Sequence, residues 1–176
     1  MKKIKVYLQR PWRFADSPYY KYLLENPPKD VEYTNVKNFK LIQNKKRLAI
    51  NNWLKLTIKK LIKRFCISLP NAHFTTSKKR YDIIHCAHCI SKNKSPWICN
   101  MEYVGQFWAS GSCENSSSRG KVLKYLRSKN CKKIIAWTEW TKKGIVEVLP
   151  EVKNKIEIVY PTIPSQKFNK KKSEKI

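Results

Sequence analysis

Acidic residues are scarce in this sequence. Its 176 residues include 12 Asp and Glu against 38 Lys and Arg, which gives a formal net charge of +26 at pH 7. So large an imbalance indicates an anionic partner, such as a nucleic acid, a membrane surface or a phosphorylated ligand. Glycine is also scarce, with four residues, and only nine are proline, which excludes collagen-like and linker-like material. Because 41% of the residues are hydrophobic, we expect a folded domain with its own core rather than a disordered chain.

Long apolar runs and a secretion signal are missing as well. No run of about 18 apolar residues occurs, and Met1, Lys2 and Lys3 lead directly into Ile4–Leu8, a segment with the composition of a strand. We therefore expect a cytoplasmic protein. Peripheral binding to the inner face of the cell membrane is compatible with this location. In a reducing compartment the six cysteines are expected to be buried free thiols.

Familiar nucleotide and nucleic-acid motifs are absent too. The sequence has no G-x-G-x-x-G and no P-loop, and the turn after the first strand, residues 9–18, contains no glycine that could approach a pyrophosphate. We therefore expect no cofactor. Helix-turn-helix, RNP and zinc-finger spacings are also missing, so we do not expect sequence-specific nucleic-acid binding. Non-specific binding to phosphates would follow from charge alone.

What the sequence does contain is an alternation of strand and helix patterns. Strands are predicted at Ile4–Leu8, Val31–Tyr33, Tyr81–Ala87, Pro96–Met101, Lys132–Trp137 and Ile156–Tyr160. Helices are predicted at Lys121–Ser128, after a Ser-rich loop at Ser116–Ser118, and at Thr141–Leu149, with Thr138 or Thr141 as N-cap. This order predicts an α/β domain with a mostly parallel sheet covered on both faces and a ligand site at the carboxyl ends of the strands. We place the domain at 1–164 and a basic tail at 165–176.

Half of the net charge lies between Tyr33 and Tyr81, where no acidic residue occurs. The centre of this stretch predicts an amphipathic helix, with apolar residues from Ile50 to Phe65 on one side and lysines on the other. We expect the apolar side to pack against the core of the domain, as in most such helices. Insertion into an anionic bilayer is the alternative interpretation.

Candidate chemistry gathers at the end of the third predicted strand. His85, Cys86, His88 and Cys89 are zinc-type ligands, but period-two geometry sends His85 and Cys86 to opposite faces, so we expect no metal site. His85 or His88, at this strand end, could accept or donate a proton or bind a phosphate. A purely structural role, with the imidazole held by hydrogen bonds, is an equally weighted interpretation. Glu102, just past the next strand, could bind a sugar hydroxyl or cap the loop that follows.

The pattern resembles the N-terminal half of a GT-B glycosyltransferase of the large retaining group. The residues that carry the resemblance are Tyr81–His88, Pro96–Glu102 and the strand–helix–strand block Lys132–Pro164, which is similar to the family's ending in K-I-x-V-I-x-P. The resemblance implies a Rossmann-like three-layer domain, one half of a GT-B fold, that binds the acceptor. The donor-binding C-terminal half and the Gly-rich loop after the first strand are not present in this sequence.

The resemblance also implies roles for individual residues. His85, His88 and Glu102 would line the catalytic cleft. Anionic lipid or acceptor phosphate would be bound by basic residues, namely Lys55, Lys59, Lys60, Lys63, Arg64 and Arg13. A nucleotide-sugar donor would bind only through a C-terminal domain, so we expect this chain alone to have little transferase activity. The alternatives are a non-catalytic α/β binding module, either a degenerate or a split-enzyme subunit, and a non-specific nucleic-acid binder.

Overall fold

The computed structural model describes residues 3–10, 18–35, 45–65, 69–111 and 116–161. Within them a parallel sheet is built from β1 (Ile4–Gln9), β2 (Val31–Tyr33), β4 (Ile83–Ala87), β6 (Trp97–Met101), β7 (Cys131–Ala136) and β8 (Ile156–Ile158). Its order is β2-β1-β4-β6-β7-β8, and every neighbouring pair is parallel. The predicted α/β class is therefore confirmed, and the domain is Rossmann-like.

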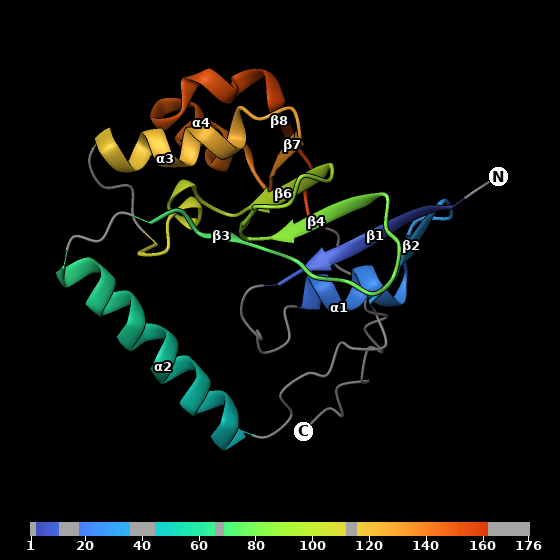
Figure 1. The fold of residues 1–176 in the computed structure, drawn as a ribbon, viewed down its shortest axis with the longest axis horizontal. Coiled ribbons are helices and arrows are strands. Elements are labelled where there is room, and N and C mark those ends of the chain that lie inside the picture. The colour runs from blue at the N-terminus through green and yellow to red at the C-terminus, as the bar shows by residue number, and fades with distance from the viewer. Residues whose placement is uncertain (1–2, 11–17, 36–44, 66–68, 112–115, 162–176) are drawn as a thin grey trace, which may run out of the picture.

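Helices cover both faces of the sheet (Figure 1). One face carries α3 (Ser116–Leu126) and α4 (Glu139–Val148), and the other carries α1 (Pro18–Glu25). The remaining elements are α2 (Lys45–Arg64), the small parallel pair β3 (Ala72–His73) and β5 (Ile90–Ser91), and the 3-10 turns η2 (Val104–Phe107) and η3 (Pro150–Lys155).

The main core lies between the sheet and the α3/α4 layer. Strand residues Ile84, Cys99 and Ile134 are fully buried there against Val122 of α3 and Ile145 of α4. A smaller cluster on the opposite face packs Leu8 and Ala87 against Tyr20 and Leu24 of α1. Because side chains alternate along a strand, β4 contributes to both clusters: Ile84 and Cys86 belong to the main core, and Ala87 belongs to the smaller cluster.

Two sequence predictions about helix starts are settled by the structure. Thr138 is the N-cap of α4, since its hydroxyl accepts a hydrogen bond from the Thr141 amide at 3.1 Å. The loop predicted at Ser116–Ser118 is wrong, because these serines form the first turn of α3. Serine suits that turn, where backbone N–H groups have no partner within the helix.

The predicted helix around Ile50–Phe65 is confirmed as α2, but the predicted packing of its apolar side against the core is wrong for all but Ile58 and Ile62. Figure 1 shows α2 standing apart from the layers of the domain. Its side chains from Trp53, Leu54, Leu61 and Phe65 are exposed, with 66% of Trp53 and 67% of Phe65 accessible. The half-buried side is a mixed stripe at helical spacing, made of Asn51, Lys55, Ile58, Lys59 and Ile62.

Candidate functional site

The strand order places a topological switch point between β1 and β4. The connection through α1 leads from β1 outward to β2, whereas the later strands add on the other side of β4. In open α/β sheets the ligand crevice lies outside the carboxyl ends of the strands at such a point. The residues at this edge are Gln9 at the end of β1, Arg10 after it, His88 after β4, Glu102 after β6 and Trp137 after β7.

His85 is enclosed just inside this edge. Its Nδ1 lies 3.1 Å from Tyr33 Oη, and its Nε2 lies 3.1 Å from the side-chain amide of Asn100. Burial lowers the pKa of His85 to about 4, although the Asn100 hydrogen bond acts in the opposite direction. The imidazole is therefore neutral at pH 7, and both of its nitrogens are occupied by protein groups.

Asn100 ties the buried groups together. Its side-chain amide forms hydrogen bonds through both atoms in one orientation. The nitrogen then donates to His85 Nε2, and the oxygen accepts from Trp137 Nε1 at 3.0 Å. In that orientation Tyr20 Oη also lies within hydrogen-bond distance of the amide. Because His85 Nε2 then accepts a hydrogen bond, its Nδ1 carries the proton and donates to Tyr33.

His88 sits in a strained turn at the end of β4. Its φ of 54° is left-handed, and among the described residues no other non-glycine has a positive φ. The turn is fixed by its amide, which donates to the Asn100 carbonyl, and by its carbonyl, which accepts from Asn71 Nδ2 at 2.7 Å. Backbone strain of this kind concentrates at functional sites.

The His88 ring is packed between aromatic groups. It meets Tyr20 and Trp137 edge to face, with centroids 5.5 and 5.1 Å apart. Burial lowers the pKa of His88 to about 4; a hydrogen bond with Gln106 raises it, and the charges of Lys55 and Arg10 lower it further. His88 is thus a neutral imidazole at pH 7 with 10% of its side chain exposed.

Glu102 is the acidic partner of His88. Its Oε1 lies 3.5 Å from His88 Nε2, and 46% of its side chain is accessible. Because His88 is neutral, this contact is not an ion pair at pH 7. Gln106 holds the residue from both sides, accepting from the Glu102 amide at 2.8 Å and donating to Oε2 at 3.4 Å. Partial burial raises the pKa of Glu102, while the bond from Gln106 lowers it.

The structure divides the predicted lipid- and phosphate-binding residues into three groups. Lys55 and Lys59 are half-buried on the side of α2 nearest the domain, and Lys59 Nζ lies beside Gly111, whose φ is +82°. Burial lowers the pKa of Lys55, and Lys59 lowers it further. Exposed positions on α2 are taken by Lys60, Lys63 and Arg64. Arg13 lies outside the described residues, as does the predicted tail at 165–176.

Two thiols reach this edge only through Gln9: Cys86 Sγ lies 3.4 Å from Gln9 Oε1, and Cys89 Sγ lies 3.9 Å from the Gln9 carbonyl oxygen. Four cysteines, Cys86, Cys89, Cys99 and Cys131, are buried free thiols as predicted, and burial raises the pKa of Cys86. Cys86 points into the α3/α4 core while His85 faces the α1 side, as the strand period predicts. No group of three or more potential metal ligands occurs in the described part of the chain.

Sequence reasoning missed several residues of this site. Tyr20 belongs to α1, a helix that was not predicted, and Trp137 was assigned only as a strand residue. Asn100 had a visible signal, because it is a fully buried amide in the otherwise apolar strand Trp97–Met101. Gln9 is a further candidate: it is 4% exposed, and its Nε2 has no hydrogen-bond partner among the residues described.

No helix in the described ranges is long and apolar enough to cross a membrane. No protein-family model matches this chain, and neither the curated proteins nor the solved structures include a significant match to it.

Proposed function

We propose that this chain is the acceptor-binding half of a glycosyltransferase, which transfers a sugar from a nucleotide-sugar to a membrane-associated or polysaccharide acceptor. The observation that carries the proposal is the contact of half-exposed Glu102 with neutral His88 beside the switch point of a Rossmann-like sheet. The resemblance of Tyr81–His88 and Lys132–Pro164 to the GT-B family supports the same interpretation.

The pair has the chemistry to activate a hydroxyl group. The acceptor oxygen would attack the anomeric carbon of the donor sugar, forming the new C–O bond as the bond to the nucleoside diphosphate breaks. The hydroxyl proton would pass to Glu102, whose raised pKa makes it a stronger base than an ordinary surface carboxylate. His88 and Gln106 hold the carboxylate in position. His85 acts as a positioning residue, because its partners Tyr33 and Asn100 leave it no access to an acceptor.

Positive charge beside this pair favours an acceptor that carries an anionic group. Lys55 and Arg10 are close enough to His88 to lower its pKa, and Lys59 adjoins Lys55. Two lysines one turn apart on the inner side of α2 suit a phosphate or carboxylate between α2 and the strand ends. The exposed apolar side of α2 then favours a lipid-linked acceptor at an anionic membrane surface.

The GT-B resemblance implies that the donor binds to a second Rossmann-like half, and the turn after β1 has no glycine that could approach a donor pyrophosphate. A non-catalytic binding module would use the same edge to hold a ligand without transferring a sugar. The two functions differ in the role of Glu102, since only transfer needs a proton acceptor.

The test replaces Glu102 by Gln in the gene of the source organism. Incorporation of label from UDP- and GDP-sugars into lipid and polysaccharide fractions is then measured in the cells' membranes. Loss of a general base typically lowers a rate by about 100-fold or more, so we expect at least that loss for one donor. Using source cells keeps whatever domain or subunit completes the enzyme.

The matched control is Glu32→Gln, which removes an exposed carboxylate on β2, on the face of the strand opposite Tyr33. It should leave incorporation unchanged. If deleting the whole gene leaves incorporation from every donor unchanged, the proposed transferase function is wrong. If deletion abolishes incorporation and Glu102→Gln does not, the chain acts in the pathway without Glu102 as its base.

A further inference from the structure

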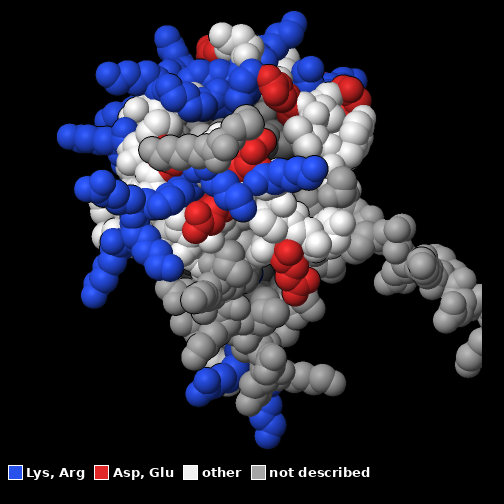
Figure 2. Space-filling model, turned by 90° about the vertical axis from the view of Figure 1, so that its right-hand side faces the viewer, with Lys and Arg blue, Asp and Glu red and all other residues white. Residues whose placement is uncertain are grey.

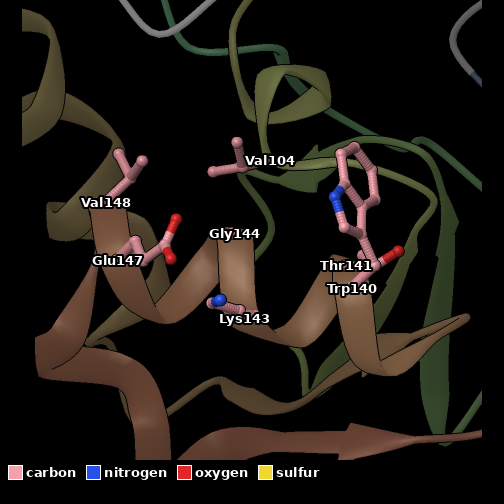
Figure 3. Close-up of a pocket in the computed structure, with 7 residues that line it drawn as sticks. All are labelled: Val104, Trp140, Thr141, Lys143, Gly144, Glu147 and Val148. Carbon is pink, nitrogen blue, oxygen red and sulfur yellow. The ribbon is translucent and has the colours of Figure 1, made fainter.

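A hollow opens on the surface between α4 and η2. It has a volume of about 330 Å³, at the lower end of the roughly 300–1,000 Å³ range typical of small-molecule pockets. One wall is a face of α4, where Trp140, Gly144, Glu147 and Val148 recur at helical spacing, and Val104 of η2 stands opposite (Figure 3). Thr141 and Lys143 complete its lining.

Gly144 lines the hollow without a side chain of its own. A Cβ atom placed there would meet no other atom within 4 Å, and its φ lies outside the positive range. Neither backbone conformation nor packing therefore requires glycine, which destabilises the interior of a helix relative to alanine. Its effect is to leave open the space between Trp140 and Val148 (Figure 3).

The lining combines an apolar ring with polar ends. Trp140 is 72% exposed, an uncommon state for the largest apolar side chain. Glu147 and Lys143 are exposed on the same helix, one a hydrogen-bond acceptor and the other a donor. A sugar ring matches this set, because its C–H face is apolar and can stack on an indole while its hydroxyl groups both donate and accept.

The hollow adjoins the backbone of Glu102. Thr141 lines the hollow, and its hydroxyl donates to the backbone carbonyl oxygen of Glu102. The N-cap Thr138 and the site residue Trp137 immediately precede α4, so this helix borders both places. A ligand with its reacting end at Glu102 can therefore extend along the start of α4.

We infer that the α4 hollow is a saccharide subsite, which binds a sugar unit of an extended acceptor at a distance from the reacting hydroxyl. The position of that unit relative to the reacting end rests on the proposed function. The binding of a saccharide to the hollow does not.

The test measures the affinity of the full chain for three neutral trisaccharides, built from glucose, mannose or N-acetylglucosamine. Saturation-transfer NMR then shows which sugar ring contacts the protein. We expect one trisaccharide to bind, with the saturation-transfer signal coming from one of its three rings. Trp140→Ala, which removes the stacking surface, and Gly144→Leu, which fills the hollow, should each weaken binding at least about tenfold. UMP, whose uracil ring could also stack on Trp140, is tested as a competitor to learn whether the hollow prefers a nucleotide to a sugar.

The matched control is Gly120→Leu. Gly120 is also a helical glycine with open space around it, but it lies in α3 and does not line the hollow. This variant should bind as the wild type does, and thermal unfolding should show that all three variants fold. The inference is overturned if no trisaccharide binds, if Gly144→Leu binds within about twofold of Gly120→Leu, or if UMP alone occupies the hollow.

Glu102→Gln separates this inference from the proposed function. We expect it to retain trisaccharide binding at the hollow, because its carboxylate does not line that space. Loss of binding in the hollow variants with full incorporation by Glu102→Gln cells would support the subsite while contradicting the proposed base.

Discussion

Three ionisable side chains at the ends of β4 and β6 differ in what they can reach. His85 is 4% exposed and has a protein partner on each ring nitrogen, so its role is to position its neighbours. His88 borders the surface, and Glu102 is accessible to about half. Only Glu102 therefore combines access with an altered pKa, which makes it the residue whose replacement tests the chemistry.

The buried histidines make a prediction about stability and pH. The pKa of His85 is about 4 in the folded chain and about 6.5 when unfolded. Between these values the unfolded chain binds a proton that the folded chain does not, so the free energy of unfolding falls as the pH falls. His85 should contribute about 2 kcal/mol of this loss between pH 7 and 4.5. Urea denaturation of wild type and His85→Gln at the two pH values measures the difference.

The control for this experiment is His73→Gln. His73 is half-buried, and its pKa is lowered by burial and by Lys92, so its variant should retain most of the wild-type pH dependence. The raised pKa of Glu102 in the folded chain changes the free energy of unfolding in the opposite direction as the pH falls. Glu102 is present in the wild type and in both variants, so its effect cancels in the comparison. An equal loss of stability in wild type and His85→Gln would show that His85 is not held neutral by the fold.

At the scale of elements, local signals were enough to predict most of the sheet. Every strand of the six-stranded sheet was anticipated, because apolar β-branched runs between turn residues are readable one segment at a time. The sequence does not predict α1, because Pro18 stands at its start and residues 9–18 have the pattern of one turn. The site network was missed for a different reason: Tyr20, Asn100 and Trp137 come from three elements and meet only after folding.

The orientation of α2 shows a limit of amphipathic patterns. Its apolar side predicts contact with the core, yet only Ile58 and Ile62 of that side are half-buried, next to Lys55 and Lys59. The other apolar residues of that side are exposed. The spacing of apolar residues indicates that a helix has two different sides. It does not determine whether the apolar side meets protein or lipid.

Vesicle flotation tests the exposed side of α2. The chain should float with vesicles of phosphatidylglycerol and phosphatidylcholine and not with phosphatidylcholine alone, because each nearby Lys or Arg adds about 1 kcal/mol at an anionic surface. Trp53→Ser with Phe65→Ser should weaken binding at least about tenfold by removing apolar contact.

Phe74→Ser is the control for the vesicle experiment, since Phe74 is 66% exposed but lies outside α2. It should float as the wild type does. Equal recovery of the wild type with neutral and anionic vesicles would contradict the proposed membrane surface, and equal recovery of the double variant and the control would exclude α2 as its site.

At the scale of the whole molecule, positive charge is spread well beyond α2. Figure 2 shows Lys and Arg crowding the upper part of one face, at the height of α3 and α4, and outnumbering the Asp and Glu interspersed among them. The described acids are partly engaged in ion pairs, such as Arg119 with Glu151 and Lys133 with Glu157. A field of this extent attracts any polyanion, so weak binding to nucleic acid is expected without a nucleic-acid function.

Salt dependence separates this general attraction from specific recognition. Two unrelated 30-base-pair duplexes should bind with equal affinity in 50 mM salt, because no base-reading motif is present. Since such binding releases counterions, affinity should fall at least about 100-fold by 200 mM salt if several phosphates are contacted. Fluorescence anisotropy at four salt concentrations gives the slope. Glu102→Gln should not alter it, because phosphate binding needs no base. A tenfold preference for one duplex, or binding that persists at 200 mM, would instead favour the nucleic-acid alternative over the acceptor site.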